Sequence, residues 1–340
     1  MEKVELDRFR ITGLLGSGAD YEVRGAVDQQ TGAQVVLKRP VPQMISRKMH
    51  AATEARTDRI LQVYQEVGST IDNLVTIVGY TDRAVHDEYY GDTHGQQYTV
   101  MVEERAKGIP LLVADMRARI TGVPTGAGQN LFALFPLIQP QGQQPFPVHQ
   151  QLMDVEEAFL KAGYFLLDLR PQNLFYQPAS CRITIVDCGA LVPVDGQPAS
   201  RHGPYQDIHD ICLEVLKFYT TPDRPPVEAQ GYREPRGLRP VVNFREELGQ
   251  MAESFAGAAD EVRKLAVHLI SKVRDRSYTD FADFRAELTA CLETVKAHRE
   301  AQADFQQARQ AWLEALDWLH GDHWQRYLFN AEAELGVFSQ

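Results

Sequence analysis

The fold of this chain is decided by two short segments, which read DLRPQNLF at residues 168–175 and IVDCG at residues 185–189. The first segment supplies a carboxylate at Asp168, a cation at Arg170 and an amide at Asn173. The second supplies another carboxylate, Asp187, fourteen residues beyond Asn173. Phosphoryl transfer requires these parts: a group that orients the attacking hydroxyl, a cation for the γ-phosphate and oxygen ligands for Mg²⁺. The spacing therefore predicts a phosphoryl-transfer site, although each segment alone is typical of an ordinary turn or capped loop.

A glycine-containing turn, Gly-Ser-Gly at residues 16–18, lies near the start of the chain between strands predicted over 9–15 and 21–27. Glycines at such a turn let backbone N–H groups approach phosphate oxygens closely. A third predicted strand, 34–38, ends at Lys38, which can direct a fixed cation at phosphates. Taken singly, the glycine turn is typical of an ordinary β-hairpin, and Lys38 is typical of a solvent-exposed lysine at the end of a strand. Strands joined by short turns predict an antiparallel meander.

Along the chain, the glycine turn at 16–18, Lys38, the segment 168–175 and the segment 185–189 follow one another. In this order they resemble the eukaryotic-like Ser/Thr protein kinase superfamily, over about residues 8–295. The resemblance implies an α+β, bilobed, protein-kinase-like fold. An antiparallel-sheet N-lobe is expected over 1–106 and a helical C-lobe over 107–297, interrupted by a Pro/Gly/Gln-rich insertion at 121–148. A helical hairpin over 298–340 is expected to follow as an appendage.

The resemblance also implies a role for each site residue, with ATP and Mg²⁺ as cofactors. Asp168 would orient a Ser or Thr hydroxyl of a protein substrate, and Arg170 would neutralise the γ-phosphate. Asn173 and Asp187 would hold Mg²⁺, and Lys38 the α/β-phosphates. The further residues expected at the nucleotide are Gly16, Ser17, Gly18, Val23, Val36, Glu54, Glu103, Arg105 and Phe175. Asp207 is expected to brace the catalytic loop.

Several positions depart from the family pattern. Tyr21 stands where the third glycine of the phosphate loop is usual, and Leu166-Leu167 replaces the His-Arg pair before Asp168. Without that Arg, we expect any activity to be independent of phosphorylation in the segment after Asp187, which is unusually short. The departures keep an alternative open: a catalytically impaired pseudokinase that acts as a binding or scaffolding module. A third possibility is phosphoryl transfer to a small molecule.

The candidate helix partner of Lys38 is Glu54. Glu54 is the one carboxylate at a plausible position in the helix predicted over 46–66. The apolar pair Ile60-Leu61 comes one turn later than the family pattern requires. Further helices are predicted over 149–163, 205–219, 245–255, 258–273 and 281–299, and further strands over 74–79, 97–102, 174–176 and 183–186, with a polar loop at 82–95.

Composition limits the possible partners and settings. The 340 residues carry a net charge of -11, so neither nucleic acid nor an anionic membrane is an expected partner. The longest apolar run, 131–138, is far shorter than the roughly 20 residues that span a membrane. The four cysteines have no CxxC spacing and the N-terminus has no signal-peptide core, so a reduced, cytoplasmic setting without zinc is expected. The protein substrate or partner is not identifiable from the sequence.

The last forty residues differ from the rest. Apolar residues recur at three- or four-residue spacing on each side of His320-Gly321-Asp322, which predicts a helical hairpin with one apolar face on each arm. We expect this tail to pack on the C-lobe. All three tryptophans, Trp312, Trp318 and Trp324, lie in it.

Overall fold

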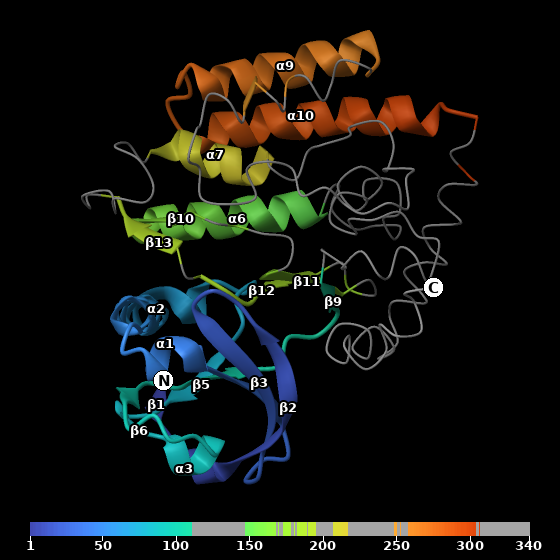
Figure 1. Cartoon of the computed structure of the whole chain (residues 1–340). Helices are drawn as coiled ribbons and strands as arrows, with labels where there is room; N and C mark the ends of the chain where they lie inside the picture. Colours follow the sequence, from blue (N-terminus) through green and yellow to red (C-terminus); the bar gives the residue numbers. More distant parts are fainter. Residues whose placement is uncertain are drawn as a thin grey trace, which may run out of the picture. The chain divides into compact units, whose positions relative to one another are not determined.

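The computed structural model is of the α+β class, and its described residues form two compact units (Figure 1). The described residues are 1–110, 147–167, 169, 173–177, 180, 182–188, 190–194, 207–216, 248–249, 252, 258–303 and 306. The first unit contains Met1–Lys107, and the second begins at Gly108. In the described ranges, no helix has the length and apolarity needed to cross a membrane.

The first unit is built on a six-stranded sheet with the order β1-β5-β8-β4-β3-β2. Its strands are β1 Glu2–Lys3, β2 Phe9–Ser17, β3 Tyr21–Asp28, β4 Gln34–Pro40, β5 Ile77–Tyr80 and β8 Met101–Glu104. The antiparallel meander predicted for the first three long strands is confirmed. The pairings of β8 with β4 and β5 were not predicted, nor was the parallel pairing of β1 with β5, in which Glu2 lies opposite Gly79.

The two faces of this sheet bury different side chains. On one face, Val35 and Leu37 of β4 join a core with Phe9, Tyr98 and Val102. On the other face, a smaller cluster joins the sheet to the helix α2, Ala51–Val67, and contains Tyr21, Ile60, Leu61, Ile77 and Met101. Because successive strand residues point to opposite faces, Lys38, which lies between Leu37 and Arg39, belongs to the α2 face together with its cross-strand neighbour Met101.

The helix predicted over 46–66 is divided in the structure. A short helix, α1 Pro42–Ser46, comes first and α2 begins only at Ala51. Between them Lys48 adopts φ 59°, in the left-handed region, which ends α1 and redirects the chain. The predicted polar loop 82–95 also contains structure, because β6 Ala84–Val85 pairs with β7 Gln97–Tyr98 and α3 spans Asp87–Tyr90. Single 3-10 turns, η1 Leu6–Arg8 and η2 Gly68–Thr70, complete the unit.

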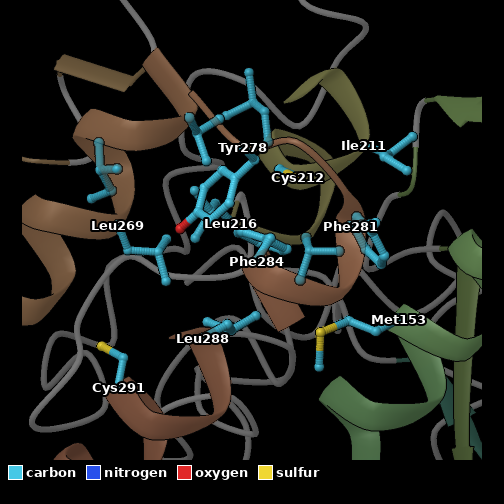
Figure 2. Close-up of a cluster of buried hydrophobic side chains, with 14 of the residues drawn as sticks. Met153, Ile211, Cys212, Leu216, Leu269, Tyr278, Phe281, Phe284, Leu288 and Cys291 are labelled. Atoms are coloured by element: carbon cyan, nitrogen blue, oxygen red, sulfur yellow. The ribbon is translucent and has the colours of Figure 1, made fainter. Parts of the chain in front are cut away.

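The second unit is mainly helical, with two small sheets. Its described helices are α6 Pro147–Lys161, α7 Ile208–Leu216, α9 Asp260–Arg274 and α10 Phe281–Glu300, which Figure 1 shows stacked one on another. Figure 2 shows the core that they enclose, with Met153, Ile211, Phe281, Phe284 and Leu288 converging. The predicted helices 149–163, 258–273 and 281–299 are confirmed within two residues at each end, and the described part of 205–219 is helical.

The small sheets are formed by strands within and beside the two segments that carry the predicted site, 168–175 and 185–189, called here the diagnostic segments. β10 Tyr164–Leu167 pairs with β13 Ala190–Pro193, and neither strand was predicted. The strands predicted over 174–176 and 183–186 are confirmed as β11 Leu174–Gln177 and β12 Arg182–Ile185, which pair with each other. β11 also pairs with β9 Ile109–Pro110. The insertion was predicted over 121–148, but its last two residues begin α6, and 121–146 lie outside the described residues. Most of the predicted helix 245–255 and the hairpin beyond residue 303, apart from 306, also lie outside them.

Candidate functional site

The two diagnostic segments connect the same pair of ladders. The chain leaves β10 at Leu167, carries residues 168–173 and enters β11, while residues 186–189 lead from β12 back to β13. At one end Leu167 is paired with Ala190, and at the other Leu174 is paired with Ile185. The described ends of both segments are therefore held together by strand pairing.

Asn173 and Asp187, the predicted metal ligands, occupy adjoining positions in this arrangement. The Val186 N–H donates a 2.9 Å hydrogen bond to the Asn173 carbonyl, and Asp187 follows directly. Both side chains are partly exposed. An amide oxygen and a carboxylate fit Mg²⁺, which takes few protein ligands and completes its shell with phosphate and water oxygens. No group of three or more His, Cys, Asp or Glu suited to a metal occurs in the described part of the chain. Asp168 and Arg170 lie outside it.

A buried carboxylate that sequence reasoning missed holds the first segment. The Leu169 N–H donates a 2.8 Å hydrogen bond to Glu214 Oε2, and Glu214 is fully buried on α7. A buried, charge-assisted bond of this kind fixes the backbone next to Asp168. The only sequence signal for it is a glutamate inside the apolar run of α7.

Asp207, to which we assigned that bracing role, has other partners in the structure. Its Oδ1 accepts the His209 backbone N–H at 2.8 Å, and Arg276 lies 2.5 Å from Oδ2. Burial acts to raise the pKa of Asp207, but the His209 N–H and the Arg276 guanidinium outweigh it and the pKa is lowered. Asp207 thus ties α7 to the segment after α9. Residues 168 and 170–172 of the loop that it was expected to brace lie outside the described residues, and Leu169 is held by Glu214.

Lys38 lies in the middle of the first unit's sheet and is paired with a carboxylate. Its Nζ is 2.9 Å from Glu103 Oε1, and both residues are more than nine-tenths buried. The pairing follows from strand register, because Val36 lies opposite Glu103 and Lys38 opposite Met101, which makes Lys38 and Glu103 diagonal neighbours on one face.

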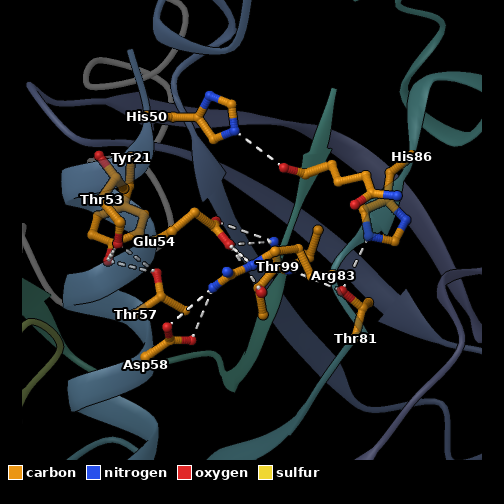
Figure 3. A network of polar contacts seen from close by, with 12 residues as sticks. Tyr21, His50, Thr53, Glu54, Thr57, Asp58, Thr81, Arg83, His86 and Thr99 are labelled. Carbon is orange, nitrogen blue, oxygen red and sulfur yellow. Dashed lines mark hydrogen bonds and ion pairs between the residues drawn. The ribbon is translucent and has the colours of Figure 1, made fainter. Parts of the chain in front are cut away.

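Glu54, the candidate helix partner of Lys38, is held by different groups (Figure 3). Its carboxylate accepts the Thr99 N–H at 3.1 Å and the Thr99 hydroxyl at 3.2 Å. Arg83 Nε lies 2.7 Å from Glu54 Oε2 and the same guanidinium also bonds Asp58. Glu54 thus joins α2 to the segment before β8.

The glycine turn is attached to α2 through the residues that follow it. Gly16 and Ser17 pair with Val23 and Glu22 at the end of the β2–β3 ladder, and the Gly18 N–H donates to the Tyr21 carbonyl at 2.9 Å. The Tyr21 ring is buried on the α2 face and its hydroxyl lies 2.9 Å from Thr57 Oγ1 (Figure 3). The side chain that replaces the usual third glycine therefore packs on α2.

The remaining predicted residues lie in both units. Val23 lies opposite Lys38 in the β3–β4 ladder, and Val36 opposite Glu103. Arg105 is bonded to the Gln34 side chain at 3.0 Å near the end of β8, and Phe175 pairs with Thr184 and Pro110 in the second unit. No protein-family model matches the chain, and comparison with curated proteins finds no significant match.

Proposed function

We propose that this chain is a divergent, bilobed, protein-kinase-like phosphotransferase that uses Mg²⁺ and ATP to phosphorylate a protein hydroxyl. The observation that carries the proposal is the adjoining position of Asn173 and Asp187, fixed by the Val186–Asn173 hydrogen bond between the two ladders. A hard cation that bridges phosphates needs oxygen ligands of this kind.

Each predicted residue has a distinct task in this proposal. Asn173 and Asp187 would hold Mg²⁺, which neutralises charge on the phosphate oxygens when it is bound. Lys38 would bind the α/β-phosphates, and Arg170 would stabilise charge on the γ-phosphate. Asp168 would orient the acceptor hydroxyl, and the next residue, Leu169, is bonded to Glu214. Catalysis by such a set is mainly positioning and electrostatic stabilisation.

A second function is favoured by a different observation. Lys38 is paired with Glu103, and Glu54 is bound by Arg83 and Thr99. Charged groups with protein partners in both positions favour a pseudokinase that acts as a binding or scaffolding module, since phosphates would compete with those partners.

Binding and transfer assays on the full chain separate the two functions. We expect Asp187→Ala to abolish the Mg²⁺ dependence of ATP affinity in calorimetry, because alanine has no oxygen that can bind the metal. Asp168→Asn should retain ATP binding but abolish transfer of labelled γ-phosphate to a generic Ser/Thr protein substrate. Glu261→Gln, an exposed charge change on α9, is the matched control.

The outcomes discriminate clearly. ATP binding without transfer in the wild type would favour the binding module. Transfer that survives Asp168→Asn would contradict the assigned role of Asp168. Absence of any ATP-dependent heat or thermal shift in the wild type would remove both the enzyme and the nucleotide-binding proposals.

A further inference from the structure

The Lys38–Glu103 pair is built into the centre of a sheet. β4 and β8 are neighbouring inner strands, and β8 is also bonded to β5 on its other side. The Glu103 backbone is therefore fixed by two ladders, and its carboxylate can leave Lys38 only by changing its side-chain conformation. A carboxylate on a helix could withdraw by movement of the helix, but Glu103 has no such freedom.

The pair is also shielded from water. The exposed fractions of the two side chains are 10% for Lys38 and 5% for Glu103. In such surroundings, charges interact more strongly than in bulk water. A phosphate that approaches Lys38 Nζ would meet the Glu103 carboxylate within a few ångströms. Like charges at that separation repel, so the attraction of the lysine for an anion is largely cancelled.

We propose that Glu103 sets the phosphate affinity of Lys38 by competing for it, so that this position disfavours polyphosphate ligands until the carboxylate is displaced. The inference rests on the proposed role of Lys38 as a phosphate-binding cation. It assigns to Glu103 a function different from the general nucleotide contact that the sequence suggested, because Glu103 acts on phosphate through Lys38.

Binding of two probes tests the competition directly. Inorganic tripolyphosphate without metal reports on the phosphate-binding cations, Lys38 among them, and Mg²⁺–ATP reports on the complete nucleotide site. We expect Glu103→Gln to bind tripolyphosphate at least about tenfold more tightly than the wild type, because the repelling charge is removed while the side-chain shape is retained. Glu88→Gln removes one negative charge from an exposed position on α3 and should leave the affinity unchanged.

Two further variants distinguish competition from a structural effect. The double variant Lys38→Gln/Glu103→Gln should not show the increased tripolyphosphate affinity of Glu103→Gln, because that increase requires the lysine. Glu103→Asp keeps the charge but shortens the side chain, and should bind tripolyphosphate more tightly than the wild type and less tightly than Glu103→Gln. Circular dichroism checks folding, and Glu103→Asp provides the direction of the effect if Glu103→Gln does not fold.

The result separates this inference from the proposed function. If the wild type does not bind Mg²⁺–ATP but Glu103→Gln binds tripolyphosphate, the competition stands and the proposed function fails. If the wild type binds Mg²⁺–ATP and removal or shortening of the Glu103 carboxylate leaves tripolyphosphate affinity equal or lower, the competition is overturned and the proposed function stands. Tripolyphosphate binding that is unaffected by every variant also overturns the inference.

Discussion

His149 illustrates how a single buried residue links stability to pH. It is fully buried near the start of α6, and burial lowers the pKa of its imidazole to about 3. The usual pKa of histidine is about 6.5, so between these values the unfolded chain binds a proton that the folded chain does not. Stability therefore falls as the pH falls, by about 1.4 kcal/mol per pH unit from this residue.

We expect His149→Gln to reduce this slope, because glutamine does not titrate. Urea unfolding at pH 7.0 and pH 5.0 gives the measurement: the wild type should lose about 2 kcal/mol more than the variant over that interval. His268→Gln, at an exposed position on α9, should follow the wild type. Parallel curves for the wild type and His149→Gln would show that His149 is not buried in its neutral form.

At the residue scale, the sequence singled out charged residues but did not predict which residues they contact. Lys38 was singled out by its place at the end of a predicted strand and by the family resemblance, and Asp187 by its spacing from Asn173. The roles of both residues stay predictions. The Lys38–Glu103 pair could not be predicted, because it depends on the β4–β8 register, which aligns Val36 with Glu103. The Leu169–Glu214 bond joins residues 45 positions apart, so local pattern carries no signal for it.

The attachment of the glycine turn to α2 is the clearest coupling between elements. Tyr21 begins β3, and its hydroxyl contacts Thr57 Oγ1 and, at 3.4 Å, the Thr53 carbonyl. Asp20 adds a 2.7 Å ion pair with Arg56, which is about one-third exposed and therefore worth little. The buried hydroxyl contact is thus the stronger of the two links.

We expect Tyr21→Phe to lower the free energy of unfolding by about 1 kcal/mol, the usual net value of one neutral hydrogen bond. Guanidinium unfolding followed by circular dichroism measures the change. Tyr80→Phe removes a hydroxyl from another ring that packs on the same cluster, and is the matched control. If the two variants are equally stable, the Tyr21 hydroxyl does not hold the turn to α2.

At the element scale, the sequence predicted the elements whose apolar pattern is local in the chain. The long helices and the β2–β3–β4 meander were found because their apolar patterns and turns are continuous in the chain. β10 was missed because Tyr164–Leu167 is a short run without alternation of polar and apolar residues, and its partner β13 is 23 residues or more away in sequence. The parallel β1–β5 pair was missed because β1 has only two residues, which is too short to show an apolar pattern.

At the scale of the whole molecule, the sequence predicts a helical hairpin in the tail, which lies beyond the described residues. The α10 helix ends at Glu300, and the apolar repeat of the predicted hairpin begins at Phe305. A hairpin of that length cannot bury two apolar stripes by itself, because short helices depend on tertiary packing. We therefore expect residues 304–340 to pack on the folded body of the chain.

Deletion of residues 304–340 should then strongly destabilise the protein. Burial of a large apolar side chain contributes roughly 1.5–3 kcal/mol, so four or five of them account for much of a typical stability of about 5–15 kcal/mol. Because Trp312, Trp318 and Trp324 are the only tryptophans, fluorescence reports on the tail alone. We expect short-wavelength emission that shifts to the red in the same urea transition that abolishes the helical circular dichroism. A truncated chain that stays soluble and melts at the full-length temperature would instead show that the apolar stripes serve a separate partner, because the body would then fold without them.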